Sequence, residues 1–461
     1  MHTQSGLETR DCRLRLWNLP FINDRLDLHM QEVIRGASVA LFLKVTGAGL
    51  AFCFNIVLAR ILGADGAGLY FIALTLATVA SVVGRAGLDN ALLRFVSANG
   101  SVGNWQAVKG VYRKGFSLAL AASSAMSAFM FLAAPLLSER VFFKPALYWP
   151  IRWMSLAVVP ITLFMLHAEI LKGLRRVRDS ILAQSVCVPA FSLAGLFALA
   201  RPWGVNGAVW AYVAAATLCA TFAHFAWRTS TPQLRGVTPS FPTAELFRSS
   251  TPLFWSALLN LVMMWASTLF LGMWGTAGDV GIFSVATRTA GLTSFILIAV
   301  NSVAAPKFAA LYRQGDMKAL ASTARNSARL MTLLAAPALL LFLLFPSWVM
   351  RIFGADFSDG AAALAILAIG QFVNVATGSV GYLLIMSGHE RLMRNILIVA
   401  ASMCILLDLL LIPLWGSLGA AIATAVSLAF QNVCAYYLVV KSLGISTILR
   451  PGWTIKEEGQ S

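Results

Sequence analysis

Twelve long apolar stretches limit what this chain can fold into more than any other feature. A helix of about 20 apolar residues spans the ~30 Å hydrocarbon core of a bilayer. The stretches are rich in Leu, Ala and Gly and lack the short alternating pattern of membrane β-barrel strands. Only 12% of the residues are charged, against about 25% in ordinary soluble domains. The sequence therefore predicts an all-α polytopic membrane protein, with spans near residues 37–59, 68–93, 115–137, 151–171, 180–200, 204–227, 250–273, 280–304, 330–350, 361–386, 395–413 and 417–440.

The net charge of +16 is spread unevenly along the chain. If the N-terminus is cytoplasmic, 26 of the 35 Lys and Arg residues fall in cytoplasmic segments. Such an excess orients a membrane protein by the positive-inside rule. We therefore expect both termini in the cytoplasm, and we expect no nucleic-acid partner. Six basic residues fall on the outer side: Arg60, Arg140, Lys144, Arg152, Arg201 and Arg351.

The sequence shows no motif of catalytic or metal-binding chemistry. Its six cysteines include no CxxC pair, and it has no GxxxxGK[ST] loop, HExxH helix or GxSxG turn. Residues 1–34 also lack the uninterrupted apolar core of a secretory signal. We therefore expect no enzyme activity, no metal and no cofactor.

The two halves of the chain repeat each other in the same order. The segment "ADGAGLYFIALT" from Ala64 matches "AGDVGIFSVATR" from Ala277, which pairs Gly68 with Gly281. Further on, "GLRRVRDSIL" matches "GHERLMRNIL", and all matched segments are separated by 212–215 residues. Six spans per half give both copies the same orientation, so we expect two pseudo-symmetric six-helix lobes. Transporters built from parallel repeats bind substrate near the midplane, at the repeat interface.

A Trp-Gly motif closes each repeat, in "RPWGVNGAVWAYVAA" and "PLWGSLGAAIATAVS". Trp203 and Trp415 suit a membrane–water interface. We expect Gly204 and Gly416 to form tight outer turns. The second glycine of each motif is expected to let the following helix pack closely on a neighbour. The motif thus predicts a structural role in turns and helix packing, and no chemical role.

The repeat and the composition divide the chain into five parts. We expect a cytoplasmic tail at 1–34, an N-terminal six-helix lobe at 35–228, a cytoplasmic linker at 229–248, a C-terminal six-helix lobe at 249–441 and a second cytoplasmic tail at 442–461.

With these motifs, the chain resembles the polysaccharide flippase branch of the multidrug/oligosaccharidyl-lipid/polysaccharide exporter superfamily. The resemblance covers nearly all of residues 35–441. Its best-matched segments are "LARILGADGAGLYFIALTLATVASVVGRAGLDNALLRFVS" and "WGSLGAAIATAVS". It implies a MATE-like fold of two six-helix lobes. It also implies alternating access that moves a polyprenyl-pyrophosphate-linked oligosaccharide from the cytoplasmic to the periplasmic leaflet.

Charged groups inside spans are costly and therefore mark candidate sites. Lys44, Arg85 and Arg288 are basic residues within spans, and Arg85 with Asp89 forms an i, i+4 pair on one expected helix face. The functional interpretation is a cavity that attracts a pyrophosphate, because the planar Arg fork suits phosphate oxygens. The alternative is a neutralised ion pair for Arg85 and Asp89. For Lys44 and Arg288 the alternative is snorkelling or pairing with a distant acid.

Further polar residues within spans are candidates for other roles. Asn55 and Asn260 could bind sugar hydroxyls or neighbouring helices. Asp408 and Glu169 are candidates for ion coupling, because a carboxylate buried among helices titrates nearer neutral pH. Glu169 lies three residues before Lys172, so an ordinary ion pair competes with this role.

These features together predict a bacterial inner-membrane flippase for lipid-linked oligosaccharides, used in making O-antigen, exopolysaccharide or capsule. Its partners would be the lipid-linked substrate, membrane lipids and the polysaccharide polymerase machinery. One alternative is a cation-coupled multidrug exporter, whose cationic substrates would favour an acidic cavity. Another is a membrane polysaccharide polymerase or ligase, but the expected outer loops are all short. The sequence does not identify the sugar, the coupling ion or the oligomeric state.

Overall fold

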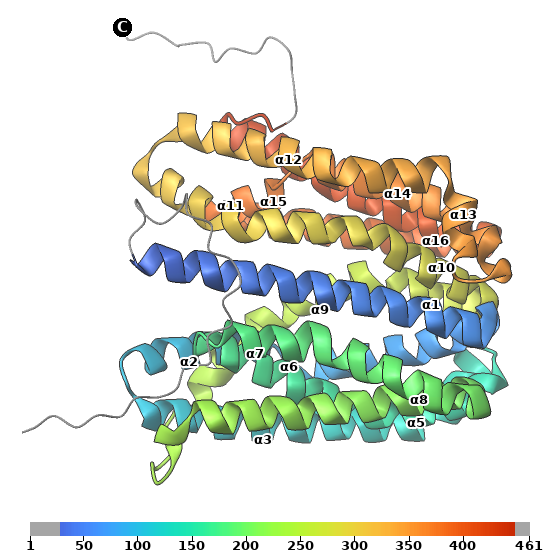
Figure 1. Cartoon of the computed structure of the whole chain (residues 1–461), viewed down its shortest axis with the longest axis horizontal. Helices are drawn as coiled ribbons and strands as arrows, with labels where there is room; N and C mark the ends of the chain where they lie inside the picture. The colour runs from blue at the N-terminus through green and yellow to red at the C-terminus, as the bar shows by residue number, and fades with distance from the viewer. Residues whose placement is uncertain (1–27, 448–461) are drawn as a thin grey trace, which may run out of the picture.

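The computed structural model describes residues 28–447, and this part of the chain is almost entirely helical (Figure 1). The expected tails lie outside it up to residue 27 and from residue 448 onward. The first helix begins at Leu28, inside the segment expected to be a tail. The helices are α1 (Leu28–Arg85), α2 (Leu88–Ser101), α3 (Trp105–Leu132), α4 (Ala134–Leu136), α5 (Tyr148–Met154), α6 (Val158–Gly173), α7 (Val177–Ile181), α8 (Cys187–Ser230), α9 (Thr243–Trp274), α10 (Ala277–Ala290), α11 (Ser294–Gln314), α12 (Met317–Leu344), α13 (Pro346–Arg351), α14 (Ala361–Ala376), α15 (Val380–Met386) and α16 (Glu390–Leu443).

Nine apolar helices of the described chain are long enough to cross a membrane. Three of them, α1, α8 and α16, contain a glycine with non-helical backbone angles, at Gly63, Gly204 and Gly416. Each of these three helices is therefore a helical hairpin with two crossings. Nine long helices thus correspond to twelve crossings, and the predicted all-α polytopic fold is confirmed.

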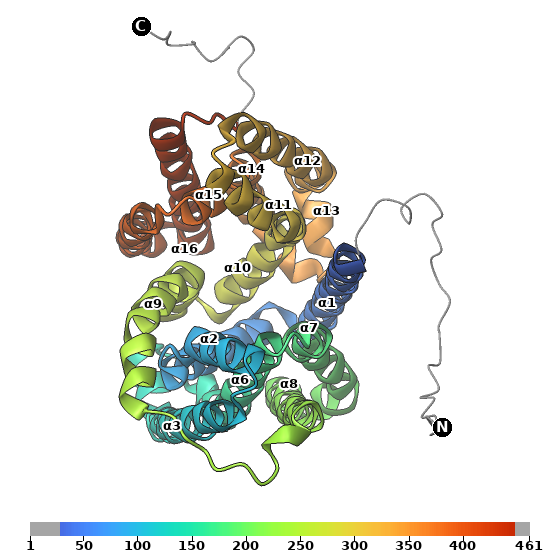
Figure 2. The same ribbon diagram turned by 90° about the vertical axis from the view of Figure 1, so that its left-hand side faces the viewer.

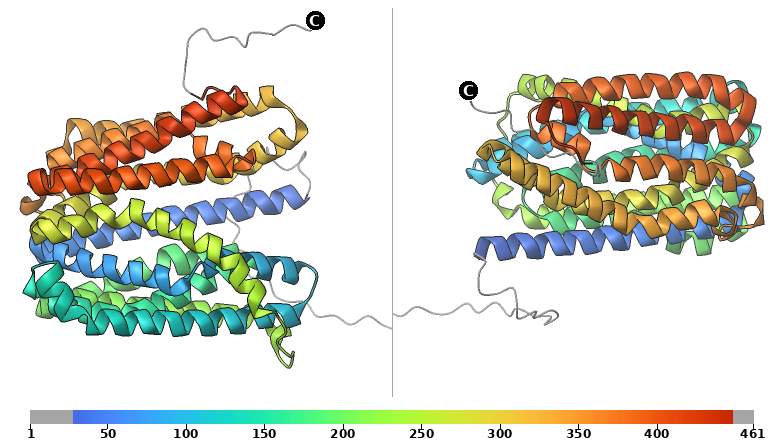
Figure 3. Two further views of the ribbon diagram at one scale, coloured as in Figure 1. Left: turned by 180° about the vertical axis from the view of Figure 1, so that it is seen from behind. Right: turned by 90° about the horizontal axis from the view of Figure 1, so that it is seen from above.

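The crossings form two bundles that lie side by side (Figure 2). Helices α1–α8 make the N lobe and α9–α16 make the C lobe. We call the end that carries the turns at Gly63, Gly204 and Gly416 the hairpin end. The opposite end carries residues 231–242, which join the lobes, and we call it the linker end. Figure 3 shows the two halves of α16 running side by side in the C lobe.

The two Trp-Gly turns have the same backbone geometry, as the repeat predicts. Gly204 has φ 52° and ψ −131°, and Gly416 has φ 52° and ψ −124°. A residue with a Cβ atom rarely adopts these angles. Trp203 and Trp415 are both exposed next to the turns, at 61% and 56%. The second glycines are close-packed as expected: a Cβ at Gly207 would lie 1.9 Å from the carbonyl oxygen of Leu199.

The lobes meet at the hairpin end through another pair of repeat-related glycines. A Cβ at Gly68 would lie 1.7 Å from the carbonyl oxygen of Ala277, and a Cβ at Gly281 would lie 2.1 Å from that of Ala64. The contact is reciprocal, as expected for two copies packed about a pseudo-two-fold axis. Glycine at both positions allows the backbones of α1 and α10 to touch.

The span expected at 68–93 is not one continuous helix. Residues Ala86 and Gly87 have positive φ values of 47° and 74°, so α1 ends at Arg85 and α2 starts at Leu88. The start of α9 crosses the chain at this break. A Cβ at Gly87 would lie 2.4 Å from the carbonyl oxygen of Ser250. The break therefore reflects a long-range contact between the two lobes, which local sequence does not reveal.

Candidate functional site

Arg288 lies in α10 and faces the N lobe. Its guanidinium carbon is 4.1 Å from the centroid of the Phe71 ring in α1 and 5.9 Å from that of Trp265 in α9. Its Nη1 donates a hydrogen bond of 3.3 Å to the carbonyl oxygen of Ser284, one turn earlier. A cation over an aromatic face is attracted by the ring electrons. Phe71 therefore holds the charge at the lobe interface without neutralising it.

Arg288 has no carboxylate partner among the described side chains, which begin at residue 39. The ion pairs in that part of the chain join Arg85 to Asp89 and Lys172 to Glu169. A guanidinium carries five N–H donors, and the bond to Ser284 leaves most of them available. Aromatic side chains thus surround a positive charge that no described carboxylate compensates.

Unpartnered hydroxyl groups lie on the two helices that meet at this charge. The hydroxyl of Tyr70 is buried without a hydrogen-bond partner and lies within electrostatic range of Arg288. Buried polar groups normally have a partner, so exceptions point to water or a ligand. The buried, unpartnered hydroxyls of α1 and α10 belong to Tyr70, Thr75, Ser284 and Thr287.

A second charged cluster lies toward the linker end of the N lobe. Arg85 Nη1 is 3.3 Å from Asp89 Oδ1, and this predicted pair forms across the break between α1 and α2 and not along one helix face. The carboxylate of Asp89 is also within electrostatic range of Glu169 and Lys172. Lys44 is half-buried and lies within electrostatic range of Lys172. The fold therefore groups Lys44, Arg85 and Asp89 but places Arg288 in a separate position.

Glu169 is fully engaged by its neighbours. Lys172 Nζ lies 2.8 and 3.0 Å from its two carboxylate oxygens, and Gln184 Nε2 donates to Oε1 at 2.7 Å. The ion pair that competed with a coupling role in the sequence is thus present in the structure. Gln184, from the π-helical turn before α8, gave no sequence signal of this contact.

Asp408 is fully buried in the C lobe, and its environment contains no basic group. Ser267 in α9 donates a 3.0 Å hydrogen bond to Oδ2, and Ser267 also contacts the hydroxyl of Thr424 at 3.1 Å. The Sγ of Cys404 lies 3.7 Å from Oδ2, while Oδ1 is buried without a partner. Asp408 and Thr424 each lie eight residues from Gly416, about 12 Å along a helix. A buried cluster of oxygen atoms from α9 and both halves of α16 thus lies well away from the turn at Gly416.

The two candidate asparagines lie on α1 and α9. Asn55 is 8% exposed, and its Nδ2 donates to the carbonyl oxygen of Ala51 at 2.7 Å on the same helix. Asn260 is exposed on α9. No group of three or more potential metal ligands occurs in the described part of the chain.

The hairpin ends of the two lobes are tied by basic side chains that the sequence placed outside the membrane. Lys144 Nζ donates to the carbonyl oxygens of Gly272 and Gly275, at 2.7 and 2.8 Å, at the C-terminus of α9. Burial lowers the pKa of this amine, and nearby Asp279 offsets part of that effect. Arg60 Nε donates to the carbonyl oxygen of Ile352 at 2.8 Å. These bonds hold the hairpin end closed, and the basic residues were not predicted to have this role.

Comparison with known proteins agrees with this architecture. The probable low-salt glycan biosynthesis flippase Agl15 of Haloferax volcanii is 25% identical over 406 residues, which are 87% of this chain and 83% of that protein. The structure of the lipid II flippase MurJ in an inward closed conformation matches with a TM-score of 0.71 at 14% identity, covering 87% of each chain. An inward-facing multidrug resistance MATE family transporter of the MOP superfamily matches with a TM-score of 0.70 at 16% identity, covering 88% of this chain and 98% of that one.

The structural matches confirm the predicted MATE-like fold of a multi-pass membrane protein. All three proteins are named as flippases or transporters, in agreement with the prediction that the chain is not an enzyme. A family model described as polysaccharide biosynthesis protein matches residues 33–312, which is more than half of the chain. The protein therefore belongs to the polysaccharide biosynthesis protein family.

Proposed function

We propose that this protein flips a polyprenyl-pyrophosphate-linked oligosaccharide across the cytoplasmic membrane by alternating access. The observation that carries the proposal is Arg288, a partly buried cation at the lobe interface with no acidic partner among the described side chains. A fixed positive charge favours an anionic headgroup and disfavours the cationic substrates of a drug exporter. The unpartnered hydroxyls of α1 and α10 supply neutral groups suited to sugar and phosphate oxygens.

The hairpin end is the periplasmic side in this proposal, because the excess of basic residues lies toward the linker end. The lobes are bound together there by the Lys144 and Arg60 hydrogen bonds. Opening toward the periplasm would break these bonds while the lobes rotate. The cluster of Lys44, Arg85 and Asp89 near the linker end would meet the pyrophosphate as it enters from the cytoplasm.

We assign ion coupling to Asp408 and not to Glu169. The Glu169 carboxylate is already neutralised by Lys172, whereas Asp408 has one oxygen unpartnered and no basic neighbour. A proton or a small cation bound at Asp408 would remove a costly buried charge. We further propose that the polymer is a bacterial surface polysaccharide, such as O-antigen, exopolysaccharide or capsule, and that polymerase machinery receives the flipped lipid.

The test is a deletion strain given radiolabelled sugar, in which both surface polymer and lipid-linked intermediates are measured. We expect intermediates to accumulate on the cytoplasmic face, and we expect wild-type protein to restore polymer. Arg288→Gln should lower polymer synthesis by about tenfold or more, as expected for loss of a charged contact to phosphate. Arg288→Lys should recover part of that loss.

Arg329→Gln is the matched control, because Arg329 is exposed on α12 of the same lobe. It should leave polymer synthesis near the wild-type level at equal membrane expression. Normal polymer in the deletion strain, together with new sensitivity to cationic dyes, would replace the flippase proposal with drug export.

A further inference from the structure

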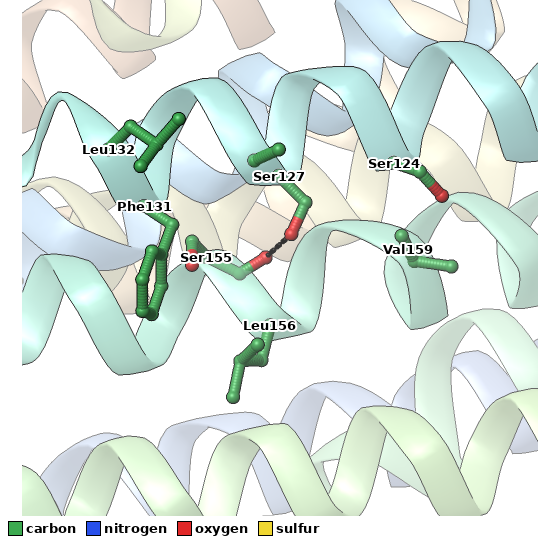
Figure 4. A pocket seen from close by; sticks show the side chains of 8 residues that line it. Ser124, Ser127, Phe131, Leu132, Ser155, Leu156 and Val159 are labelled. Atoms are coloured by element: carbon green, nitrogen blue, oxygen red, sulfur yellow. Dashed lines mark hydrogen bonds between the residues drawn. The ribbon is translucent and has the colours of Figure 1, made fainter.

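A groove of about 350 Å³ lies on the N lobe. Its walls are the second half of α3 and the turn between α5 and α6 (Figure 4). Helix α3 lies at the edge of the N lobe remote from α10 and α11 (Figure 2). The groove is therefore separate from the Arg288 interface. Its exposed lining residues are Ser124, Ala128, Leu132 and Leu156.

The walls of the groove present hydrocarbon even though three serines line it. Ser127 Oγ donates to the carbonyl oxygen of Ser155 at 2.7 Å, and this bond ties the two walls together (Figure 4). Ser155 Oγ donates to the carbonyl oxygen of Arg152 at 2.7 Å. Two of the three hydroxyls are thus used inside the protein, and small side chains hollow the surface without making it polar. Such a surface accepts an acyl chain better than a polar ligand.

A cation lies at the hairpin end of the groove. The guanidinium carbon of Arg152 is 4.3 Å from the ring centroid of Phe131, which itself lines the groove. Tyr148 and Trp149 lie at 5.4 and 5.8 Å, and Nη1 donates to the hydroxyl of Tyr148. Aromatic residues of this kind mark the membrane–water interface. The Arg152 charge therefore lies at headgroup level, one helical turn from Ser155.

The Arg152 guanidinium is held in place but not neutralised. Its Nε is buried without a hydrogen-bond partner, and neither ion pair of the described side chains from residue 39 onward includes it. Arg60 and Lys144, which lie at the same end of the molecule, donate instead to carbonyl oxygens across the lobe interface. Arginine offers a planar fork that matches phosphate oxygens. A cation above an apolar groove thus complements an anionic headgroup above an acyl chain.

We propose that this groove, with Arg152 at its mouth, is a binding site for an anionic phospholipid of the leaflet at the hairpin end. One acyl chain lies between α3 and α6, and the phosphate contacts the Arg152 guanidinium. The occupant is a lipid of the surrounding bilayer and not the transported lipid, because α3 lies at the edge of the N lobe remote from α10 and α11. The charge on Arg152 selects anionic over zwitterionic headgroups.

The experiment uses the full-length protein in vesicles that contain phosphatidylglycerol or phosphatidylcholine, each with the same photoactivatable acyl chain. Cross-linked peptides are mapped by mass spectrometry. We expect cross-links within 124–132 and 155–159, with yields about tenfold higher for phosphatidylglycerol, the size of one charge-assisted hydrogen bond. Arg152→Gln should abolish that preference and Arg152→Lys should retain part of it. Arg140→Gln, an exposed arginine at the same end, should leave the preference unchanged.

A second variant tests the chain-binding part separately. Ala128→Leu fills the groove and should lower cross-linking by both lipids, while the thermal stability of the protein stays near wild type. If both lipids cross-link equally and Arg152→Gln does not change the yields, the bound lipid is ordinary annular lipid and the proposal is overturned. Loss of phosphatidylglycerol cross-links on adding inorganic phosphate alone, or displacement by polyprenyl phosphate, would also overturn the phospholipid assignment.

Discussion

The Asp408 carboxyl is the clearest residue-scale test of ion coupling. Its partners are neutral hydroxyl and thiol groups from α9 and α16, so a bound proton or cation would have to neutralise its charge. We predict that Asp408→Asn lowers gradient-driven flipping in proteoliposomes by about tenfold, or ~1.4 kcal/mol. The rate without a gradient should change little. The measurement compares imposed sodium and proton gradients.

Asp359→Asn is the control for this prediction, because Asp359 is exposed at the hairpin end. It should preserve the response to the gradient. An Asp408→Asn protein that keeps the full response to both gradients would exclude the residue from coupling.

Sequence alone identified the charges of these sites but not their surroundings. Asp408 stood out because no basic residue lies near it along the chain. Its contact with Ser267 joins residues 141 positions apart and depends on packing between α9 and α16. The sequence did not mark Phe71 and Tyr70 as site residues, since aromatic residues in an apolar span are typical of ordinary packing. Only the crossing of α1 and α10 brings Phe71 to Arg288.

At the scale of elements, the Trp-Gly hairpins test the internal repeat. Gly204→Ala and Gly416→Ala each force a Cβ into a backbone conformation that costs about 1–3 kcal/mol. We expect both substitutions to lower the thermal stability of the purified protein by similar amounts. The double variant should show the sum, because the two turns lie in different lobes.

Gly49→Ala serves as the comparison, since Gly49 lies in α1 and a Cβ there meets nothing within 4 Å. It should be neutral or slightly stabilising. Wild-type melting behaviour in both hairpin variants would argue against a shared structural role for the motif.

The Lys144 contact with α9 tests closure at the hairpin end. Lys144→Met keeps much of the side-chain length but removes the donor to Gly272 and Gly275. We predict a several-fold increase in the population of open molecules, measured with spin labels at Arg140→Cys and Arg351→Cys in a cysteine-free background. The two labels lie on different lobes, so open molecules show longer distances between them. Loss of hydrogen bonds to a charged donor, worth about 1–3 kcal/mol, gives a shift of this size.

Lys109→Met provides a matched control at the linker end. Lys109 Nζ likewise donates to two carbonyl oxygens, of Leu234 and Val237, but within the segment that follows the N lobe. The distance distribution at the hairpin end should not respond to it. An identical response to both substitutions would show a general loosening of the protein.

At the same scale, long apolar stretches were sufficient to predict twelve crossings, and the Trp-Gly motifs predicted the turns at Gly204 and Gly416 but not the turn at Gly63. The apolar stretch at 68–93 did not predict the helix break at residues 86–87. The i, i+4 spacing of Arg85 and Asp89 is itself typical of a continuous helix. The break there depends on α9 crossing at Gly87, a contact with a segment more than 160 positions away. Local sequence carries no information on such a crossing.

For the whole molecule, the repeat explains how one chain builds an interface with a single central charge. Gly68 and Gly281 pack on each other at the axis, so corresponding residues of α1 and α10 face each other. The equivalent of Arg288 in the N lobe is Thr75, at the same spacing of 213 residues. Divergence of the repeats therefore places a cation on one side of the interface and a hydroxyl on the other.

The central claim is that this protein by itself moves an anionic lipid-linked glycan between leaflets. The most direct measurement reconstitutes the purified protein in vesicles with a fluorescent polyprenyl-pyrophosphate oligosaccharide and adds an impermeant glycosidase outside. We predict that wild-type protein exposes nearly all of the glycan to the enzyme, while Arg288→Gln leaves the inner-leaflet share protected. Protection that is the same with wild-type protein and with protein-free vesicles would contradict the account.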